Sequence, residues 1–498
     1  MSTGSPTRVA VRFPPYVTAG WRAQCLAGLA AAGEVATFDL ATLDLEIAHE
    51  AGNADLIVDV STAPIEARLL TLPRLGYWTF VYGDEPDRTD PGLAEFVAGG
   101  RAAYVRLVRM NRMNSATVLR EGAVKVVKHS LKATRERLLA AVVDWPAQEL
   151  KEALQSSPSD SLPTVQLRHR ARAARTLLRA ALPLAWVRNL LARTLQEMTR
   201  EHWAIGVIPE PVQEVCRRFD PSRIRWLPPP ADGFLADPFG RVLPDGTLVI
   251  MAEALSWGDG RGRIVAFESQ PNGILTPPEE VFSFNTHASY PQLIEHQGAI
   301  YCIPETQIQR RVQLFRAEPF PHRWVPDVVL LEDFAGADAT VHFHQDRWWL
   351  FVGNHDDQDE TKLFVFHAPD LRGPWLPHAR NPVKCDLRSA RPAGPLFSME
   401  GGLYRPAQDC STTYGGAVVI NRIERLGPDE FLERPVRRLE PAAHGPYPDG
   451  LHTLSGAGNV TLVDGKRHAL SAATLTPRLQ RLVRELSRKL NVARRVVN

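Results

Sequence analysis

Five short motifs in the second half of the chain carry side chains that could do chemistry, and they recur at intervals of roughly 50 residues. The motifs are Leu235–Phe239, Ser289–Leu293, Ala337–Val341, Ala390–Gly394 and Leu451–Ser455. They contribute aspartate, tyrosine, arginine and histidine. Carboxyl and imidazole groups transfer protons, and arginine pairs bidentately with carboxylate or phosphate. Such a set suits a site for a polar ligand.

The elements that would position these side chains follow from the repeat itself. A period of this size is that of a four-stranded propeller blade. After most motifs comes an acidic or amide residue in a short turn, usually followed by glycine, and then an apolar strand, which is the signature of a tight hairpin. The expected turns are Asp245-Gly246, Gln297-Gly298, Gln345-Asp346, Glu400-Gly401 and Asp464-Gly465. The pattern predicts a five-bladed β-propeller over residues 203–471.

The innermost strand of each blade in a propeller faces a central channel, so one polar residue per repeat should meet there. The expected residues are Asp237, His287 or Tyr290, Asp338, Arg391 and His452, joined from the next strands by Glu253, Glu305 and the pair Gln408-Asp409. Burying so many ionisable groups is costly unless they are used or paired with one another. Two interpretations remain open: a ligand site, or an ion-pair network that fills the channel.

Further motifs extend this pattern along residues 203–471. They are Ala236-Asp237-Pro238, Ser289-Tyr290-Pro291, Ile303-Pro304-Glu305, Phe320-Pro321-x-x-Trp324, Asp338-Ala339, Leu371-x-Gly373-Pro374-Trp375, Ala390-Arg391-Pro392 and Gln408-Asp409-Cys410. In this order they resemble the five-bladed propellers of arabinanase and β-xylosidase type glycoside hydrolases. They resemble still more closely the N-terminal domain of glucosamine inositolphosphorylceramide transferase.

The hydrolase resemblance implies roles for several residues. Asp237 matches the general base and Asp338 the aspartate that orients and tunes the site. Arg391 stands in the fourth blade where the hydrolases have their acid. Because protonating a glycosidic oxygen needs a carboxylic acid, either Glu305 substitutes as the candidate catalytic acid or simple hydrolysis is not performed. Arginine suits an anionic group, so a phosphorylated, acidic or lipid-linked sugar is expected. The predicted substrate-binding residues are Arg391, His287, Tyr290, His452, Glu253, Gln408 and Asp409.

No metal or cofactor is predicted. His342 and His344 share one face of a strand, but such a pair more often lines a wet surface than binds zinc or calcium. The five cysteines include no Cys-x-x-Cys spacing, which favours reduced thiols and a cytoplasmic protein. The alternative is a location peripheral to the inner face of the membrane, reached through the basic helices. Basic and acidic residues number 58 and 56, so nucleic acid is not an expected partner.

Residues 1–150 predict an α/β domain of Rossmann-like type with a parallel sheet. Its strands are Arg8–Phe13, Val35–Phe38, Leu56–Val60 and Tyr77–Val81, with a helix over Trp21–Ala32. The turn over residues 14–20 lacks the closely spaced glycines of a dinucleotide site.

The motifs Gly76–Asp84, Val118–Gly122 and Trp145-Pro146-Ala147 resemble the formyltransferase-like domain. Thr79 and Val81 stand where that family has an asparagine and a histidine. Because formyl transfer needs a proton acceptor and an oxyanion donor, the resemblance implies a catalytically silent relative.

Residues 151–202 are expected to form a linker with basic helices. Residues 472–498 read as a basic amphipathic helix with an apolar face of Leu479, Leu482, Val483, Leu486 and Leu490. Such a helix either docks on the protein or makes peripheral contact with an anionic membrane.

The leading functional hypothesis is cleavage or transfer of a glycosyl unit in the propeller. The alternatives are a non-catalytic module that binds a glycan or glycolipid, and formyl or acyl transfer to an amino sugar by residues 1–150.

Overall fold

The computed structural model describes residues 7–14, 17–32, 35–39, 54–62, 65, 67–71, 73–84, 90–155, 162–167, 172–269, 275–282 and 284–470. Contacts divide the chain into two units, Met1–Asn189 and Leu190–Asn498. The predicted domain at 472–498 lies outside the described residues.

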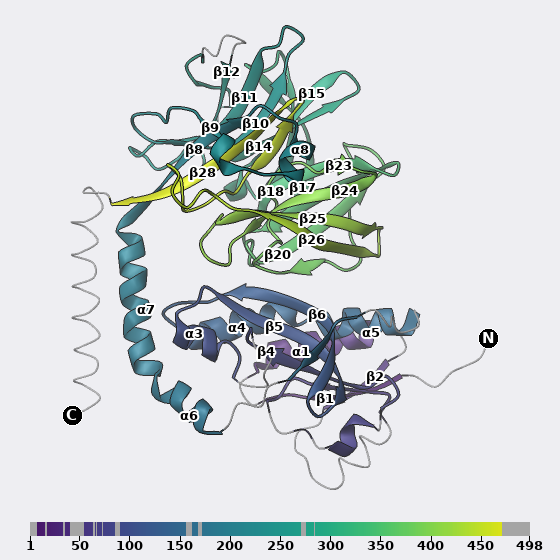
Figure 1. Ribbon diagram of the computed structural model, residues 1–498. Helices are drawn as coiled ribbons and strands as arrows, with labels where there is room; N and C mark the ends of the chain where they lie inside the picture. The colour runs from purple at the N-terminus through teal and green to yellow at the C-terminus, as the bar shows by residue number, and fades with distance from the viewer. Residues whose placement is uncertain are drawn as a thin grey trace. The chain divides into compact units, whose positions relative to one another are not determined.

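The first unit is built on one mixed sheet with the strand order β2-β1-β3-β4-β5-β6-β7 (Figure 1). Its strands are β1 (Thr7–Arg12), β2 (Val35–Asp39), β3 (Leu56–Asp59), β4 (Tyr77–Tyr82), β5 (Ala102–Arg112), β6 (Ser115–Lys125) and β7 (Thr164–Gln166). The first four pair in parallel, as predicted. The prediction of a parallel sheet fails for the rest, because β5 and β6 form a long antiparallel hairpin and β7 adds to its edge.

The helices of this unit are α1 (Ala19–Ala31), α3 (Leu93–Ala98), α4 (Leu131–Val142), α5 (Trp145–Gln155) and α6 (Arg172–Ala180), with a 3-10 turn η1 (Ala67–Leu70). Helix α1 begins where the Thr18 hydroxyl accepts a hydrogen bond from the Trp21 backbone N–H at 3.2 Å, which satisfies one of the free donors of its first turn. Helix α7 (Leu182–Glu197) continues across the division between the two units. The region expected as a linker therefore supplies a strand and two helices. The α/β class is observed, while the Rossmann-like and formyltransferase-like assignments stay predictions.

The second unit contains five sheets, and each is one blade of a propeller. The first two blades are β10 (Phe234–Val242), β11 (Leu248–Leu255), β12 (Gly262–Ser269) and β13 (Glu279–Glu280), then β14 (Ser289–His296), β15 (Ala299–Glu305), β16 (Arg311–Ala317) and β17 (Trp324–Glu332). The third is β18 (Gly336–His344), β19 (Arg347–Asn354), β20 (Lys362–Ala368) and β21 (Leu376–Pro377), with β22 (Lys384–Cys385) also on β20. The fourth is β23 (Phe397–Met399), β24 (Gly402–Asp409), β25 (Ala417–Leu426) and β26 (Phe431–Leu439).

The fifth blade joins the two ends of the propeller sequence. Strands β27 (Leu454–Ala457) and β28 (Val460–Leu470) pair with β8 (Thr199–Ile208) and β9 (Arg225–Trp226), so the ring is closed by hydrogen bonds between its first and last strands. A short helix α8 (Val212–Arg217) and a 3-10 turn η2 (Pro221–Arg223) connect β8 to β9, and η3 (Gln307–Gln309) follows β15. The prediction of five blades is confirmed, with strand β8 beginning a few residues before the expected start at 203.

Four of the five predicted hairpin turns lie between the first two strands of their blades. Gln297 and Gly298, for example, have φ of 50° and 75°, the left-handed conformation that such turns require. The fifth prediction is wrong. Asp464-Gly465 lies inside β28, and the turn between β27 and β28 is at Gly458, with φ of 61°.

Apolar side chains fill the space between neighbouring blades. In one such core, Ile303 and Leu314 of the second blade pack with Val341 and Leu350 of the third, and all four are buried. The alternation of strand side chains therefore sends one face of each sheet to the next blade. The polar residues of the motifs lie at the inner ends of the strands.

Candidate functional site

Three blades present their motif residue through the same backbone irregularity. The pairing of the first two strands shifts register between Ala236 and Phe239 in the first blade, and the second and third blades show the same shift. The residues at these bulges, Asp237, Tyr290 and Asp338, have φ of 51°, 46° and 50°. A left-handed conformation in a residue other than glycine costs on the order of 1–3 kcal/mol and collects at functional sites. The same left-handed conformation thus occurs in three blades and directs three polar side chains toward the propeller axis.

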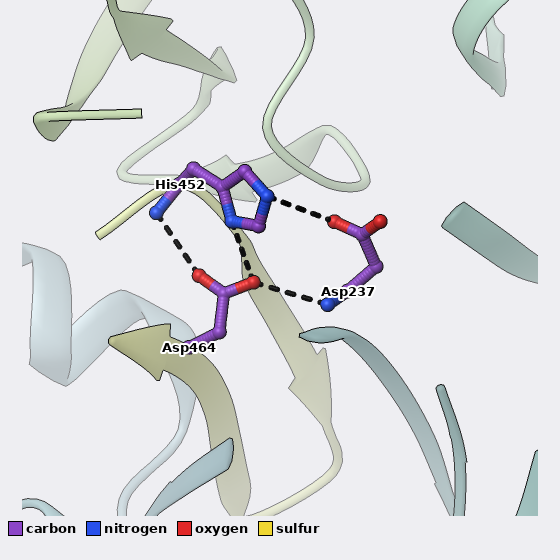
Figure 2. Close-up of side chains that lie close together, drawn as sticks. All are labelled: Asp237, His452 and Asp464. Atoms are coloured by element: carbon purple, nitrogen blue, oxygen red, sulfur yellow. Dashed lines mark hydrogen bonds and ion pairs between the residues drawn. The ribbon is translucent and has the colours of Figure 1, made fainter. Parts of the chain in front are cut away.

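One half of the axial cluster is a histidine between two aspartates (Figure 2). His452 Nδ1 lies 2.6 Å from Asp464 Oδ2, and His452 Nε2 lies 3.5 Å from Asp237 Oδ1. The imidazole ring stacks on Trp203 with centroids 3.9 Å apart. All three polar residues are at least nine-tenths buried. The contacts hold the imidazole in one orientation.

Asp464 organises the backbone as well as the histidine. Its Oδ1 accepts hydrogen bonds from the backbone N–H groups of His452 and Thr453, at 3.0 and 2.9 Å, and its Oδ2 accepts one from Asp237 N at 3.0 Å. The Thr453 hydroxyl in turn donates to Asp237 Oδ1 at 2.9 Å. Asp464 thus ties the first blade to the fifth.

The three ionisable groups respond differently to burial. For Asp237, burial raises the pKa, and the nearby His452 only partly offsets it. For His452, burial lowers the pKa but the charges of Asp464 and Asp237 outweigh this and raise it. For Asp464, burial raises the pKa, while the His452 charge and hydrogen bonds overcome this and lower it. The stable arrangement is an imidazolium–carboxylate pair beside Asp237, which retains its proton more readily than an exposed aspartate.

These three residues could offer one donor atom each to a cation, since the atoms lie within 4.8 Å of one another. Both oxygens of Asp464, however, already accept hydrogen bonds from backbone N–H groups. The arrangement is therefore complete as an ion pair. The expectation of no metal stays a prediction.

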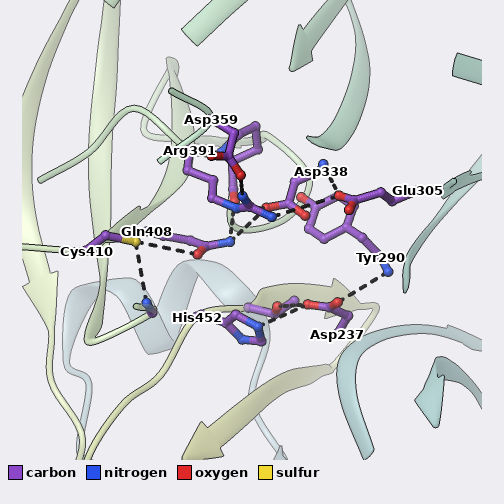
Figure 3. Close-up of polar contacts among 12 residues, drawn as sticks. Asp237, Tyr290, Glu305, Asp338, Asp359, Arg391, Gln408, Cys410 and His452 are labelled. Carbon is purple, nitrogen blue, oxygen red and sulfur yellow. Dashed lines mark hydrogen bonds and ion pairs between the residues drawn. The ribbon is translucent and has the colours of Figure 1, made fainter. Parts of the chain in front are cut away.

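The other half of the cluster joins the second, third and fourth blades (Figure 3). Arg391 Nε donates to Asp338 Oδ2 at 2.6 Å, and its guanidinium also pairs with Asp359. The backbone N–H of Asp338 donates to Glu305 Oε2 at 2.8 Å. His355 lies between Glu305 Oε1 and Asp359 Oδ2, with Nε2 and Nδ1 each 3.0 Å from the respective oxygen. Asp338 and Glu305 are therefore direct neighbours.

Asp338 and Glu305 are driven to opposite protonation states. Burial is the main reason that the pKa of Asp338 rises to about 8, and Glu305 adds to the rise while Arg391 opposes it. Burial would also raise the pKa of Glu305, but the hydrogen bond from His355 and the charge of Arg391 outweigh it and lower the pKa to about 2. At neutral pH, Asp338 is mostly protonated and Glu305 is ionised.

His355 completes this set as the partner of Glu305. Burial lowers its pKa, but its hydrogen bonds to Asp359 and Glu305 outweigh burial and raise the pKa to about 9. The histidine is therefore mostly cationic at neutral pH. Its positive charge stabilises the ionised carboxylate of Glu305.

The remaining predicted residues include four that lie in the axial cluster or at its edge. Tyr290 donates its backbone N–H to Asp237 Oδ2 at 3.3 Å, and the side-chain amide of Gln408 donates to Asp338 Oδ2 at 2.9 Å. Glu253 lies beside His287, with 3.3 Å between Glu253 Oε1 and His287 Nε2. Burial and the neighbouring Asp237 raise the pKa of Glu253 well above its usual range. These residues belong to the cluster or its edge.

Two of the predicted substrate-binding residues, Asp409 and Arg391, form ion pairs within the protein. Asp409 turns away from its neighbour Gln408 and pairs with Arg438 on β26, with 2.9 Å between Asp409 Oδ2 and Arg438 Nε. The sequence predicts that Arg391 binds an anionic ligand, and in the structure its guanidinium pairs with three carboxyl groups, those of Asp338, Asp359 and Glu305, while its side chain is only 6% exposed. The pairing supplies positive charge to the cluster itself.

Sequence reasoning missed several members of the cluster. Asp464 was assigned to a turn because aspartate-glycine is the usual hairpin signal. Asp359 and His355 lie in the loop after β19, where no period marks them, although the concentration of His355, Asp356 and Asp357 was a visible signal. Thr453 directly follows the predicted His452 in the fifth motif.

Part of the propeller region matches a known protein family. Residues 229–444 match the family model described as glucosamine inositolphosphorylceramide transferase 1, N-terminal. The protein of that name from Oryza sativa subsp. japonica is 32% identical over 253 residues, which are 47% of this chain and 33% of the relative. The Arabidopsis thaliana protein is 33% identical over 206 residues, 40% of this chain and 27% of the relative. The match thus spans about a third of the relatives' length or less.

Solved structures with a similar chain course include RS223-Beta-xylosidase, with a TM-score of 0.35, 11% identity and coverage of 47% of this chain and 92% of that one. An exo-1,5-alpha-L-arabinanase from a bovine ruminal metagenomic library has a TM-score of 0.31 and 13% identity over 40% of this chain and 76% of that one. The five sheets, rather than these scores, identify the propeller. The chain therefore contains a five-bladed β-propeller. Its propeller is similar in sequence to the N-terminal part of the glucosamine inositolphosphorylceramide transferases.

Proposed function

We propose that the propeller cleaves or transfers a glycosyl unit at the axial cluster, with Asp338 as the proton donor. The observation that carries this proposal is the contact between Asp338 and Glu305, two buried acids that are held in opposite protonation states. A pair of titratable groups whose pKa values are pushed apart is typical of acid and base assignments in enzymes. A neutral carboxylic acid is what a glycosidic oxygen requires as its bond breaks.

Asp338 replaces Glu305 as the candidate acid. Arg391 and Gln408 both donate to Oδ2 of Asp338, so the proton of the neutral acid is placed on Oδ1. Glu305 is a poor donor because its pKa is lowered to about 2. Its fixed negative charge instead suits the positive charge that develops on the sugar ring.

Asp237 keeps the role of general base. In its ionised form it accepts the proton of the attacking water or acceptor hydroxyl, while Asp338 gives its own proton to the leaving oxygen. Burial raises the pKa of Asp237, which makes the ionised form a stronger base. The two proton transfers balance over one glycosyl transfer.

The names of the relatives suggest a substrate class. They are named for glucosamine and inositolphosphorylceramide. We propose a substrate of the same chemical kind for this chain, a sugar attached to a phosphate-bearing lipid headgroup.

A second candidate is a module that binds the same glycan without turning it over. The close mutual pairing of the cluster favours it, since Asp338, Glu305 and Arg391 are 3%, 6% and 5% exposed and each contacts another member. A ligand would then contact the outer residues His287 and Glu253, where His287 is only partly buried. The two candidates differ in whether a bond is broken.

The test uses Asp338→Asn in the full chain, with release of glucosamine from a glucosaminyl inositolphosphorylceramide as the assay. Removing a general acid should lower turnover by about 10²–10⁴-fold while leaving ligand binding measurable. Asp327→Asn is a control of the same type, because it changes an aspartate on the outermost strand of the second blade that pairs with Arg372, and it should leave turnover unchanged. Full turnover in Asp338→Asn would exclude the proton-donor role. Saturable binding of the glycolipid without turnover in the unaltered protein would establish the second candidate.

A further inference from the structure

Strands β8 and β28 of the fifth blade carry three basic side chains on one face. His202 lies directly across from Arg467 in the strand register, and Arg200 is two residues from His202. Residues two apart in a strand point to the same side, and directly opposite residues of an antiparallel pair have Cβ atoms about 4.5–5.5 Å apart. Arg200, His202 and Arg467 therefore form one basic patch. Arg467 is exposed, and the other two are partly exposed.

Aromatic rings hold the members of the basic patch. Trp257, in the loop between β11 and β12, lies 5.1 Å from the guanidinium carbon of Arg200 and 4.9 Å from the ring of His202, measured at its ring centroid. The guanidinium carbon of Arg467 lies 5.8 Å from the ring centroid of Tyr447. A guanidinium that lies over an aromatic ring keeps the N–H groups at its edge available as donors. The rings thus position both arginines without using their hydrogen bonds.

The basic patch has no acid to balance it. Among the described residues, neither Arg200 nor Arg467 forms an ion pair with a carboxylate. The neighbouring Glu201 points to the other face of β8, where its Oε1 lies 3.1 Å from Lys466 Nζ and 3.5 Å from His468 Nε2. Like charges that face one another on a sheet destabilise it. A set of basic side chains without an acid is therefore typical of a place where an anion binds.

The donors of the basic patch suit a phosphate group. Burial lowers the pKa of His202, and the positive charges of Arg467 and Arg200 lower it further. The imidazole is therefore mostly neutral at neutral pH and donates one hydrogen bond, while the two arginines supply the charge. The planar fork of a guanidinium matches two oxygens of a phosphate, and such charge-assisted hydrogen bonds are stronger than neutral ones.

Packed aromatic side chains connect the basic patch to the axial cluster. Trp257 contacts Phe234, with ring centroids 5.5 Å apart, and both belong to one apolar cluster with Trp203. Trp203 in turn stacks on His452 of the axial cluster. The arrangement suits a ligand that carries a sugar and a phosphate at separate positions.

We propose that Arg200, His202 and Arg467 bind the phosphate group of the ligand. This inference rests on the proposed function, in which a sugar is attached to a phosphate-bearing headgroup. The sugar then lies at the axial cluster and the phosphate on the basic patch. The anionic contact that the sequence predicts for Arg391 passes to this patch, because Arg391 already pairs with three carboxyl groups.

Two sources contain such a phosphate, a lipid headgroup and inorganic phosphate. Among the described residues, no helix is long and apolar enough to cross a bilayer. Water-soluble probes represent both sources. Glycerophosphoinositol carries the phosphodiester and the inositol of a headgroup without its apolar chains, and myo-inositol is the matching probe without phosphate.

The test is calorimetric titration of the full chain with glycerophosphoinositol, inorganic phosphate and myo-inositol. The unaltered protein should bind a phosphate-bearing probe and should not bind myo-inositol. Arg200→Gln/Arg467→Gln removes both charges and should weaken that binding by about 100-fold, because two charge-assisted hydrogen-bond donors are lost. Arg467→Gln alone, at an exposed position, should weaken it by about tenfold.

Arg311→Gln/Arg434→Gln is the matched control. It removes the same charge from two exposed arginines of the second and fourth blades, which pair with Glu332 and Glu424. The control should bind the probes as the unaltered protein does. Urea midpoints of all variants show whether the fold is kept.

Each result decides a separate question. Tighter binding of glycerophosphoinositol identifies a headgroup as the source of the phosphate, and tighter binding of inorganic phosphate identifies the free ion. An equal loss in the two double variants would show that only the overall charge attracts phosphate, and this would overturn the proposal. Undiminished binding in Arg200→Gln/Arg467→Gln, or no binding of either phosphate probe to the unaltered protein, would overturn it too.

The titration needs no turnover, so failure of this proposal and failure of the proposed function can be told apart. Phosphate binding through the basic patch in a protein that transfers no glycosyl unit would contradict the proposed function alone. Glycosyl transfer without phosphate binding would contradict the role of the basic patch alone.

Discussion

Both units of this protein bury aspartates deeply, but they balance the charge in different ways. In the first unit, Asp59 is fully buried and pairs with Arg12, with 3.0 Å between Asp59 Oδ2 and Arg12 Nη2. Asp59 also accepts hydrogen bonds from the backbone N–H of Ser61 at 2.9 Å and from the hydroxyl of Tyr77. The pair consists of one carboxylate, that of Asp59, and one guanidinium, that of Arg12. The ion pair is neutral as a whole.

The propeller axis has a different balance. Its carboxyl groups are Asp237, Glu253, Glu305, Asp338, Asp359 and Asp464, and its principal basic groups are Arg391, His355 and His452. An excess of acids in a buried place cannot be fully ionised, so some must keep their protons. A pair of one carboxylate and one guanidinium has no carboxyl proton to donate. A cluster with more acids than bases keeps carboxyl protons that can be transferred. This difference is the physical reason to seek chemistry at the axis and structure at Asp59.

The largest expected effect comes from removing the arginine of each site. Arg12→Met and Arg391→Met should each lower the free energy of unfolding of their own unit by about 3–5 kcal/mol. Arg12→Met leaves Asp59 without its guanidinium, and Arg391→Met removes one of the cations that face Glu305 and Asp359. A second substitution, which makes the partner aspartate neutral, should then affect the two sites differently. Adding Asp59→Asn should restore most of the loss in the first unit, while adding Asp338→Asn should restore little, because Arg391 also faces Asp359 and Glu305.

Urea unfolding followed by probes in each unit measures these changes. Equal rescue by the two asparagine variants would mean that Arg391 and Asp338 are a simple pair, and the comparison would fail.

The sequence predicted the propeller well for a physical reason. A repeated blade must repeat its turn and its inward residue, so Asp237, Asp338 and Arg391 could be found by their spacing alone. The same logic failed at Asp464, where an aspartate-glycine pair lies within a strand instead of a turn. Closure of the fifth blade by β8 was also invisible, because pairing between segments more than 250 residues apart leaves no local pattern.

The protonation states of the axial carboxyl groups could not be predicted from the sequence. The sequence suggests Glu305 as the acid, but it does not show that His355 contacts this carboxylate, because His355 comes from a loop without a repeat signal. In the first unit, the sequence pattern predicted the parallel strands β1, β2, β3 and β4. It did not indicate the direction of β5 and β6, because alternating apolar residues look the same in parallel and antiparallel strands.

A smaller effect is expected in the pH dependence of propeller stability. The pKa of Asp338 is raised in the folded state, so its contribution to stability is full below the pKa of the unfolded chain and is lost as the pH rises toward and through about 8. Asp338→Asn should remove this contribution and flatten the fall in stability between about pH 4 and 8. Urea midpoints across this range measure it. An unchanged slope would show that Asp338 is ionised in the fold and cannot serve as the acid.

The smallest expected effect is in the first unit, where a formyl donor should give no response. The Thr79 side chain is fully buried and its hydroxyl donates to the Asp59 carbonyl at 2.8 Å, and Val81 is also fully buried. Neither can offer the proton acceptor or the oxyanion donor that formyl transfer requires. Calorimetric titration of the full chain with formyltetrahydrofolate should therefore show no saturable heat, with any affinity weaker than about 1 mM. Saturable binding would contradict the interpretation of this unit as silent and would favour formyl or acyl transfer to an amino sugar. Because Asp59 and Arg12 already form a neutral pair beside Thr79, such binding would have to use groups other than these.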